Sequence, residues 1–334
     1  MNFMRIPLKK GLLGLSGLAF GALFLTLALR QFDRHQFEFA LTTLRWPLIG
    51  AACALYWMAL GLRVYRWRTL LVELKAVSVA AVAESLLVGY AVNNLLPARL
   101  GELFRADYAK RRLEFTRSTL LGSIIVERLL DLVAILSCLA LGLLLIQTVV
   151  NAERLTTFKV IAAYALLIVV LGLLGVRTLT SRSTFITKRL SQKLARIALD
   201  LKAGLVSLNR RSRTVAICAS VAIWLFEVGA LWMIFQALNI TLTPGQALLL
   251  MGAASLSTLV PTAPGYVGTY QFVFALAMGA FGLPETLGVV ASTLVQCFLF
   301  GSVTLAGLGC YFTRTVFALR DRPTPDSAPG LVNG

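Results

Sequence analysis

The residues best suited to bind a polar ligand lie in one short segment, NNLLPARLGELFR, between two apolar stretches. Its amides are Asn93 and Asn94, and its charged residues are Arg99, Glu102 and Arg105. Ionisable groups are costly in hydrocarbon, so inside a membrane they usually line a polar cavity or a ligand site. Because an arginine fork can bind phosphate through two hydrogen bonds, the segment predicts a site for an anionic head group.

The three charged residues of this segment share one helix face if the chain is helical after Pro97, because they are spaced three apart. Arg105 has a second interpretation, since it precedes the basic run 110–112 and could mark the cytoplasmic edge of the membrane. For Arg99, which lies between Pro97 and Gly101, we favour a functional role.

Two apolar segments are interrupted by helix breakers, and broken backbone at membrane depth is tolerated only where it is buried in protein or lines a cavity. The first break contains Pro97 and Gly101. The second break, in SLSTLVPTAPGYVGTYQFVF, contains Pro261, Pro264, Gly265 and Gly268. We predict two re-entrant hairpins that enter from opposite leaflets, an arrangement that marks transporter binding sites. Helix N-termini at the breaks would favour an anion.

A second charged cluster, made of Glu127, Arg128 and Asp131, lies early in a long apolar run. Glu127 and Asp131 are four apart and share a helix face. These charges can pair with Arg99 or Arg105, or Glu127 can change its protonation during transport. A purely structural network of ion pairs is the alternative, and the sequence leaves it open.

The composition places these groups in a polytopic membrane protein. Hydrophobic residues make up 58% of the 334, charged residues 14%, and the mean hydropathy is +0.80, so too little polar surface is left for a water-soluble domain. Apolar runs of about 20 residues predict about six full transmembrane helices, at 11–29, 46–62, 118–150, 158–176, 214–238 and 285–312. With the interrupted runs 77–96 and 245–281, we expect an all-α fold of about eight membrane segments, resembling an inverted repeat.

The net charge of +17 does not indicate nucleic acid, because the basic residues gather in particular loops between the apolar runs. One group precedes the first run, and another fills the loop 177–213. A third group follows the second run and consists of Arg63, Arg66, Arg68 and Lys75. By the positive-inside rule this side is the cytoplasm, which predicts a multi-pass protein of the cell inner membrane with both termini cytoplasmic.

We expect residues 1–320 to form one integral membrane domain and residues 321–334 to be a disordered cytoplasmic tail. Within the domain, apolar residues of 184–208 recur at spacings of three and four, with basic residues off that stripe. This pattern predicts a basic amphipathic helix that lies on anionic head groups. Alternatively, the segment is a connector whose charges enforce topology.

The sequence shows no glycine-rich nucleotide loop, zinc cluster or nucleophile elbow. We therefore expect no enzymatic activity, no metal and no cofactor. Glu84 and Glu227 are isolated acids within apolar runs, and each is either protonated and hydrogen-bonded or part of a proton path.

Two patterns, N-x-x-P-x-R-x-G-E ending at Glu102 and E-R-x-x-D ending at Asp131, occur together with Pro264, Gly265 and Gly268. On these residues the chain resembles the lysylphosphatidylglycerol synthase transmembrane region family, also called flippase-like integral membrane proteins, over about 5–315. The resemblance implies a lipid flippase fold. Some members carry a C-terminal aminoacyl-transferase domain that attaches lysine to phosphatidylglycerol, and this chain stops where that domain would begin. The resemblance thus implies lipid handling without synthesis.

One departure from the family pattern concerns the second break. Many relatives have a glutamate after P-G-G-x-G, where this sequence has Gln271, and Tyr266 replaces a glycine. The resemblance therefore does not carry over a charged step at that position.

The leading hypothesis is a bacterial inner-membrane lipid transporter, in which the two hairpins form a midplane cavity for a polar head group. The predicted substrate-binding residues are Asn93, Asn94, Arg99, Glu102, Arg105, Glu127, Arg128, Asp131 and Gln271. Candidate lipids are a modified anionic phospholipid, a polyprenyl-phosphate carrier and a hopanoid-type lipid.

Two hypotheses of other classes compete with transport. The chain could be a non-catalytic membrane subunit that recruits or regulates a lipid-modifying enzyme or a glycosyltransferase. An intramembrane transferase with Glu127 or Asp131 as base is the weaker alternative, because no nucleophile or metal cluster accompanies them. The oligomeric state is left open, with a homo-oligomer as one option.

Overall fold

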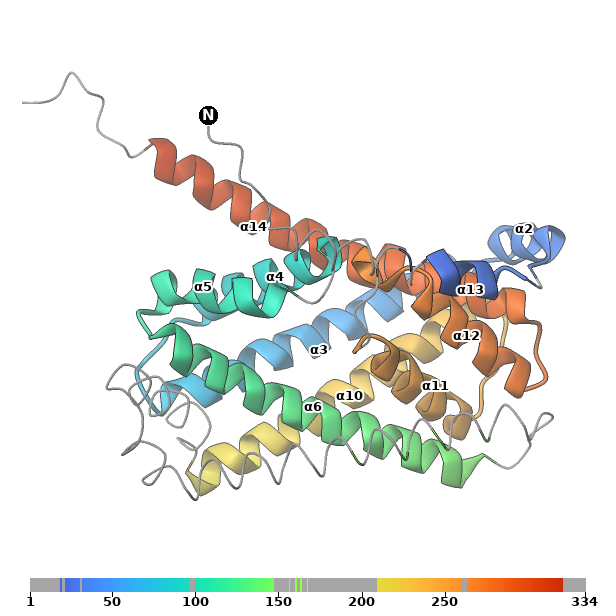
Figure 1. Ribbon diagram of the computed structural model, residues 1–334, viewed down its shortest axis with the longest axis horizontal. Helices are drawn as coiled ribbons and strands as arrows, with labels where there is room; N and C mark the ends of the chain where they lie inside the picture. Colours follow the sequence, from blue (N-terminus) through green and yellow to red (C-terminus); the bar gives the residue numbers. More distant parts are fainter. Residues whose placement is uncertain are drawn as a thin grey trace, which may run out of the picture.

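The computed structural model describes residues 22–30, 32–96, 100–146, 209–259 and 263–320, together with positions 19, 156, 160, 163 and 167. The regular elements of this part of the chain are all helices (Figure 1). They are α2 (Arg34–Thr42), α3 (Trp46–Val72), α4 (Val79–Leu95), α5 (Gly101–Leu113), α6 (Arg117–Leu145), α10 (Arg210–Ala237), α11 (Pro244–Ser257), η2 (Pro264–Tyr266), α12 (Thr269–Ala280), α13 (Glu285–Leu294), η3 (Val295–Phe300) and α14 (Gly301–Arg320).

Four helices are long and apolar enough to cross a membrane, and they match four of the predicted spans. These are Trp46–Val72, Arg117–Leu145, Arg210–Ala237 and the continuous stretch Glu285–Arg314. In the part that the structure describes, the chain is therefore all-α, with the long apolar helices of a polytopic membrane protein. The predicted spans at 11–29 and 158–176 fall mostly outside the described residues, and the predicted amphipathic helix 184–208 and tail 321–334 fall wholly outside them.

Side-chain caps fix where several of these helices begin. The side chain of Thr116 accepts a hydrogen bond from the Thr119 amide at the start of α6, and Asn209 does the same for α10. Thr243 and Gln246 form a reciprocal capping box at the start of α11. Such caps satisfy N–H groups that the helix itself leaves unpaired.

Small residues allow the helices to pack closely, as expected where lipid removes most of the hydrophobic drive for association. On the seam between α6 and α11, a Cβ at Gly142 would lie 2.5 Å from the backbone nitrogen of Leu249. A Cβ at Gly252 would lie 2.6 Å from the side chain of Leu139. A larger residue at either glycine would push the two helices apart. Other extended pairings join α3 to α10 and α4 to α14.

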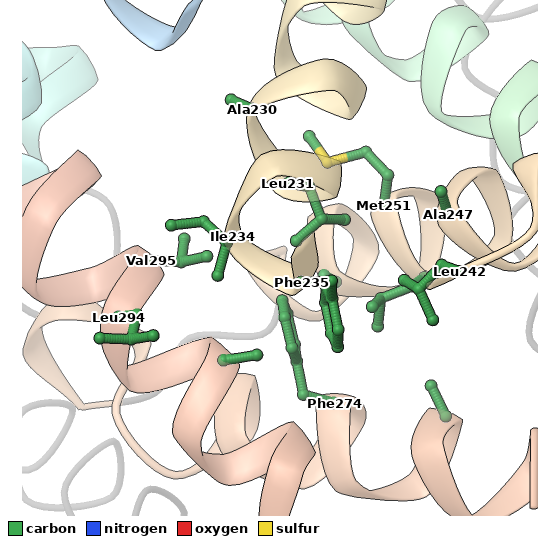
Figure 2. Close-up of a cluster of buried hydrophobic side chains, with 14 of the residues drawn as sticks. Ala230, Leu231, Ile234, Phe235, Leu242, Ala247, Met251, Phe274, Leu294 and Val295 are labelled. Atoms are coloured by element: carbon green, nitrogen blue, oxygen red, sulfur yellow. The ribbon is translucent and has the colours of Figure 1, made fainter. Parts of the chain in front are cut away.

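A buried apolar cluster holds α10, α11, α12 and α13 together (Figure 2). Phe235 of α10 stacks on Phe274 of α12 at its centre, with ring centroids 6.2 Å apart and planes 12° apart. Leu231, Met251 and Val295 belong to the same cluster, and these three residues also face the cavity described below. The cluster therefore sets one wall of that cavity.

Two helix–break–helix units lie between long helices along the chain. In the first, α4 and α5 pack against each other around the break at 96–100; in the second, α11 leads through η2 to α12. Figure 1 shows α4 and α5 toward one end of the long helices and α11 and α12 toward the other. The two breaks approach each other, because a Cβ at Gly265 would lie 3.6 Å from the backbone oxygen of Asn94.

The helix ends form two groups with different charge. At one end, on the left of Figure 1, Lys75 pairs with Glu114, and Glu73 accepts hydrogen bonds from Asn209 and Ser212. Basic residues predominate there: Lys75, Lys110, Arg111, Arg112, Arg117, Arg210, Arg211, Arg213 and Arg314. The opposite end carries a balanced set, made of Arg30, Arg34, Arg45, Asp33, Glu38 and Glu285.

Candidate functional site

A cavity of about 290 Å³ lies where the two helix breaks meet. Its wall combines residues of α3, α4, α5, α6 and α10 with residues of the second unit and of η3. The polar and aromatic residues of the wall are Tyr56, Arg63, Tyr90, Asn93, Asn94, Glu102, Arg128, Asp131, Trp224, Glu227, Ser255, Thr258, Tyr266, Tyr270 and Phe300. A concave site with convergent polar groups is the default position of a ligand.

Five of the predicted binding residues line this cavity: Asn93, Asn94, Glu102, Arg128 and Asp131. Three others, Arg105, Glu127 and Gln271, are buried but do not belong to the lining. The predicted residues Pro97, Arg99 and Pro261 lie outside the described part of the chain.

The two asparagines hold the first unit together as well as facing the cavity. The backbone N–H of Gly101 donates to Oδ1 of Asn93 at 2.8 Å, so this amide caps the start of α5. Nδ2 of Asn94 donates to Oγ1 of Thr304 at 2.9 Å and to the carbonyl of Phe300 at 3.3 Å. The pair therefore ties the tip of α4 to both α5 and α14.

An ion-pair network lies along one side of the cavity. Nη2 of Arg63 lies 2.5 Å from Oε1 of Glu227, and its Nη1 donates to Asp131 at 3.2 Å. Arg66 lies 2.8 Å from the same aspartate and donates to Ser220 at 2.8 Å. Three helices, α3, α6 and α10, are joined by these contacts.

The network continues behind the cavity wall. Nη2 of Arg105 lies 2.8 Å from Oε2 of Glu127, and the guanidinium stands 3.5 Å from the centroid of the Trp67 ring. Arg66 approaches the same carboxylate at 3.9 Å. The structure thus shows the pairing of Glu127 with Arg105 that the sequence left as one alternative.

The interpretation of Arg63 and Arg66 as cytoplasmic flanking charges is wrong. Helix α3 continues to Val72, ten residues beyond the predicted end of the span, and both arginines are buried, at 8% and 0% exposure. The apolar run ended at residue 62 only because these charges begin there. Their spacing of three, which puts both on one helix face, was the signal that could have identified them.

The acids interpreted as isolated have partners. Glu227 pairs with Arg63, as described above. Glu84 lies at the basic end, where it accepts hydrogen bonds from Tyr108 at 2.5 Å and Arg112 at 2.8 Å and approaches Arg314 at 3.3 Å. Each acid therefore has at least one cationic partner.

Arg128 is the least committed arginine of the network. Its Nε lies 3.4 Å from Glu102 and its Nη1 lies 3.6 Å from Asp131, both beyond a strong charged hydrogen bond. Its Nε has no hydrogen-bond partner among the described residues, whereas its side chain is 31% exposed. Arg128 therefore combines a place in the cavity wall with unused donor capacity.

The second break is closed by two glutamine side chains. The Gly268 N–H donates to Oε1 of Gln271 at 2.8 Å, and Nε2 of Gln271 donates to Oε1 of Gln296 at 2.5 Å. Gln296 in turn donates to the carbonyl of Gly265 at 2.9 Å. Positive φ angles at Gly265, at 65°, and Gly268, at 92°, agree with the predicted breakers. Tyr266 has φ 62°, a conformation that glycine adopts more easily.

A second cavity of about 380 Å³ adjoins the first and shares Asn94 and Phe300 with it. Its other residues include Leu95, Val267 and Leu305, which are 47%, 40% and 72% exposed. We call this space the lateral groove. It is apolar and open at the surface of the helix bundle, beside both breaks.

The part of the chain that the structure describes holds no group of three or more His, Cys, Asp or Glu residues that could bind a metal ion. The cavity wall combines arginines, carboxylates, amides and aromatic rings.

Comparison with known proteins finds relatives that match most of the chain. The family described as lysylphosphatidylglycerol synthase TM region matches residues 14–307. A UPF0104 membrane protein of Methanocaldococcus jannaschii is 25% identical over 219 residues, which are 65% of this chain and 91% of the relative. The glycosyltransferase AglD of Haloferax volcanii is 25% identical over 298 residues, 78% of this chain but 47% of that protein. No solved structure matches.

Proposed function

We propose, from the premise that this chain belongs to the lysylphosphatidylglycerol synthase transmembrane region family, that it moves a lipid with a phosphate-containing head group across a bacterial inner membrane. The observation that carries the proposal is Arg128, whose side chain is 31% exposed in the wall of a cavity between two helix breaks and whose contacts to Glu102 and Asp131 are only 3.4 and 3.6 Å long. Such an arginine can donate charged hydrogen bonds to a phosphate at a depth of the membrane where little water is available to solvate it.

In this proposal the head group occupies the cavity while its hydrocarbon chain lies in the lateral groove. The shared residues Asn94 and Phe300 connect the two spaces, and the exposed leucines of the groove suit contact with lipid chains. The helix breaks act as re-entrant hairpins from opposite leaflets, so head groups reach the cavity from either side in turn.

The charge of the helix ends supports an orientation. The end that carries Lys75, the basic run 110–112 and the start of α10 faces the cytoplasm, and the charge-balanced end faces outward. Catalysis has no part in this proposal, and membrane lipid is the partner.

Leaflet exchange in reconstituted vesicles tests the proposal. The probe is tail-labelled fluorescent phosphatidylglycerol, and the readout is the fraction quenched by an impermeant reductant. Arg128→Gln should slow exchange by about tenfold, the effect of about 1.4 kcal/mol of lost binding. Arg117→Gln is the matched control, because Arg117 pairs with Asp107 on the surface at 2.9 Å and lies outside the cavity. Equal exchange by the wild type, by Arg128→Gln and by protein-free vesicles would refute transport.

A second candidate function is an accessory membrane subunit that recruits a glycosyltransferase. Its support is the glycosyltransferase relative, less than half of which is matched by this chain. Copurification from crosslinked membranes tests it. A stoichiometric glycosyltransferase partner together with no exchange activity would favour the subunit over the transporter.

A further inference from the structure

Aromatic rings cover one part of the cavity wall. The centroid of Phe300 lies 5.6 Å from that of Tyr270, 6.3 Å from that of Tyr266 and 6.4 Å from that of Tyr56. These four residues belong to η3, α12, η2 and α3, so the rings converge from different parts of the chain. The π-helical turn η3, a feature often found at functional sites, places Phe300 among them. The electron-rich ring faces attract polarised C–H groups, which a sugar ring presents on its faces.

A neutral donor in the same wall has no partner. Trp224 lines the cavity at 6% exposure, and its Nε1 makes no hydrogen bond within the described residues. Leaving a buried donor unsatisfied costs about 1–3 kcal/mol, so an oxygen atom of a ligand at this position would be favoured. A hydroxyl or ether oxygen supplies that acceptor without bringing a charge.

The ion-pair network disfavours a head group with further charges. The four arginines and four acids of the network balance: Arg63, Arg66, Arg105, Arg128, Glu102, Glu127, Asp131 and Glu227. Because the network as a whole is neutral, it holds no surplus charge that would neutralise a further cation or anion on the head group. Hydroxyl groups can donate to the carboxylates and accept from the arginines, so a neutral group satisfies both.

We propose that the cavity selects a neutral, hydroxyl-rich head group of the sugar or polyol class, attached to its lipid through the phosphate that Arg128 contacts. This inference rests on the proposed function and adds the class of its substrate. The ring of the sugar lies against Tyr270 and the rings around Phe300, and one of its oxygens accepts from Trp224.

Binding to the purified full-length protein in detergent tests the class directly. The probes are three water-soluble esters of one short prenol: the hexosyl phosphate, the bare phosphate and the phosphoethanolamine. Binding is measured as the ligand-dependent rise of the thermal unfolding midpoint. We expect the hexosyl phosphate to bind at least about tenfold more tightly than the other two. Trp224→Phe, which keeps a ring but loses the donor, and Tyr270→Leu should both remove most of this preference.

Trp57→Phe is the control, because its indole N–H donates to Ser302 at 3.2 Å and lies outside the cavity. It should keep the preference of the wild type. Failure of Tyr270→Leu to fold would not remove the test, since the preference of the wild type and of Trp224→Phe decides it.

The outcomes separate this inference from transport. Equal or tighter binding of the bare phosphate or the phosphoethanolamine, or no binding of any probe, overturns the sugar or polyol class. Preferential binding of the hexosyl phosphate without leaflet exchange keeps the class but refutes transport. Preferential binding that Trp224→Phe leaves unchanged overturns the assigned role of Trp224.

Discussion

Replacing Arg105 by methionine should destabilise the fold, because the carboxylate of Glu127 would stay buried without its nearest cation. The two side chains lie 2.8 Å apart, each at 2% exposure. Removing one partner of a buried pair costs about 3–5 kcal/mol. The lost stacking on Trp67 raises the cost, whereas Arg66, at 3.9 Å, offsets part of it. We therefore expect the free energy of unfolding to fall by about 4 kcal/mol.

The double variant Arg105→Met, Glu127→Gln removes both charges and should recover about half of that loss. Unfolding by sodium dodecyl sulfate in mixed micelles is followed by far-ultraviolet circular dichroism. It gives the free energy of unfolding of the wild type, of each single variant and of the double variant, which together make a double-mutant cycle. Arg117→Met, at an exposed ion pair with Asp107, should change stability by at most about 1 kcal/mol.

The same pair should be dispensable for exchange, because neither residue lines the cavity. At equal amounts of folded protein, the double variant should exchange lipid at a rate within about threefold of the wild-type rate. Such a difference corresponds to a change of less than about 1 kcal/mol in the activation free energy. A loss of less than about 1 kcal/mol of unfolding free energy in Arg105→Met would refute the reasoning. It would also be refuted if the double variant lost as much unfolding free energy as the two single variants added together.

Three further predictions concern the helix breaks and the lateral groove. Gly101→Ala would place a methyl group against the carbonyl of Gly89 and Oδ1 of Asn93, so we expect a severalfold lower folded yield by size-exclusion chromatography; a normal yield would contradict the close approach. Tyr266→Gly should relieve about 1–2 kcal/mol of left-handed backbone strain and so raise the thermal midpoint, yet slow exchange because a ring leaves the wall; a lowered midpoint would count against it. Gly301→Trp should fill the lateral groove and slow lipid exchange by about tenfold while leaving binding of a chain-free head group unchanged, and unaltered exchange would show that the groove is not the route of the chain.

The position of the first helix break could be predicted from its residues. Asn93, Asn94 and Glu102 reach the cavity because a proline and a glycine interrupt an apolar run at membrane depth, and polar groups there need a protein-lined space. In the E-R-x-x-D pattern Arg128 and Asp131 are three residues apart, which puts them on one face of α6, and both line the cavity.

The ion-pair network could not be predicted from local spacing. Glu227 is 164 residues from Arg63, and Asp131 is 68 residues from it, so only tertiary packing brings them together. A hydropathy window also ends a span at its first charges, which is why Arg63 and Arg66 were assigned to the membrane edge. Neutralisation by distant acids lets α3 continue past them.

The aromatic part of the cavity was missed for a similar reason. Tyr56, Tyr270 and Phe300 look like ordinary apolar residues within three separate helical segments, and only the contact of the two helix breaks makes them neighbours. A π-helical turn has no reliable sequence signal, so the position of Phe300 could not be anticipated.

The central claim is that the two helix breaks lie together inside the membrane, and crosslinking in native membranes tests it most directly. In a background in which the five native cysteines are replaced by serine, Leu95→Cys and Val267→Cys should be joined by a short bis-maleimide, because both residues line the lateral groove. Leu95→Cys with Leu144→Cys, at the far end of α6, is the control pair and should not be joined. Failure of the first pair to crosslink, while each single cysteine reacts with a maleimide, would contradict the account.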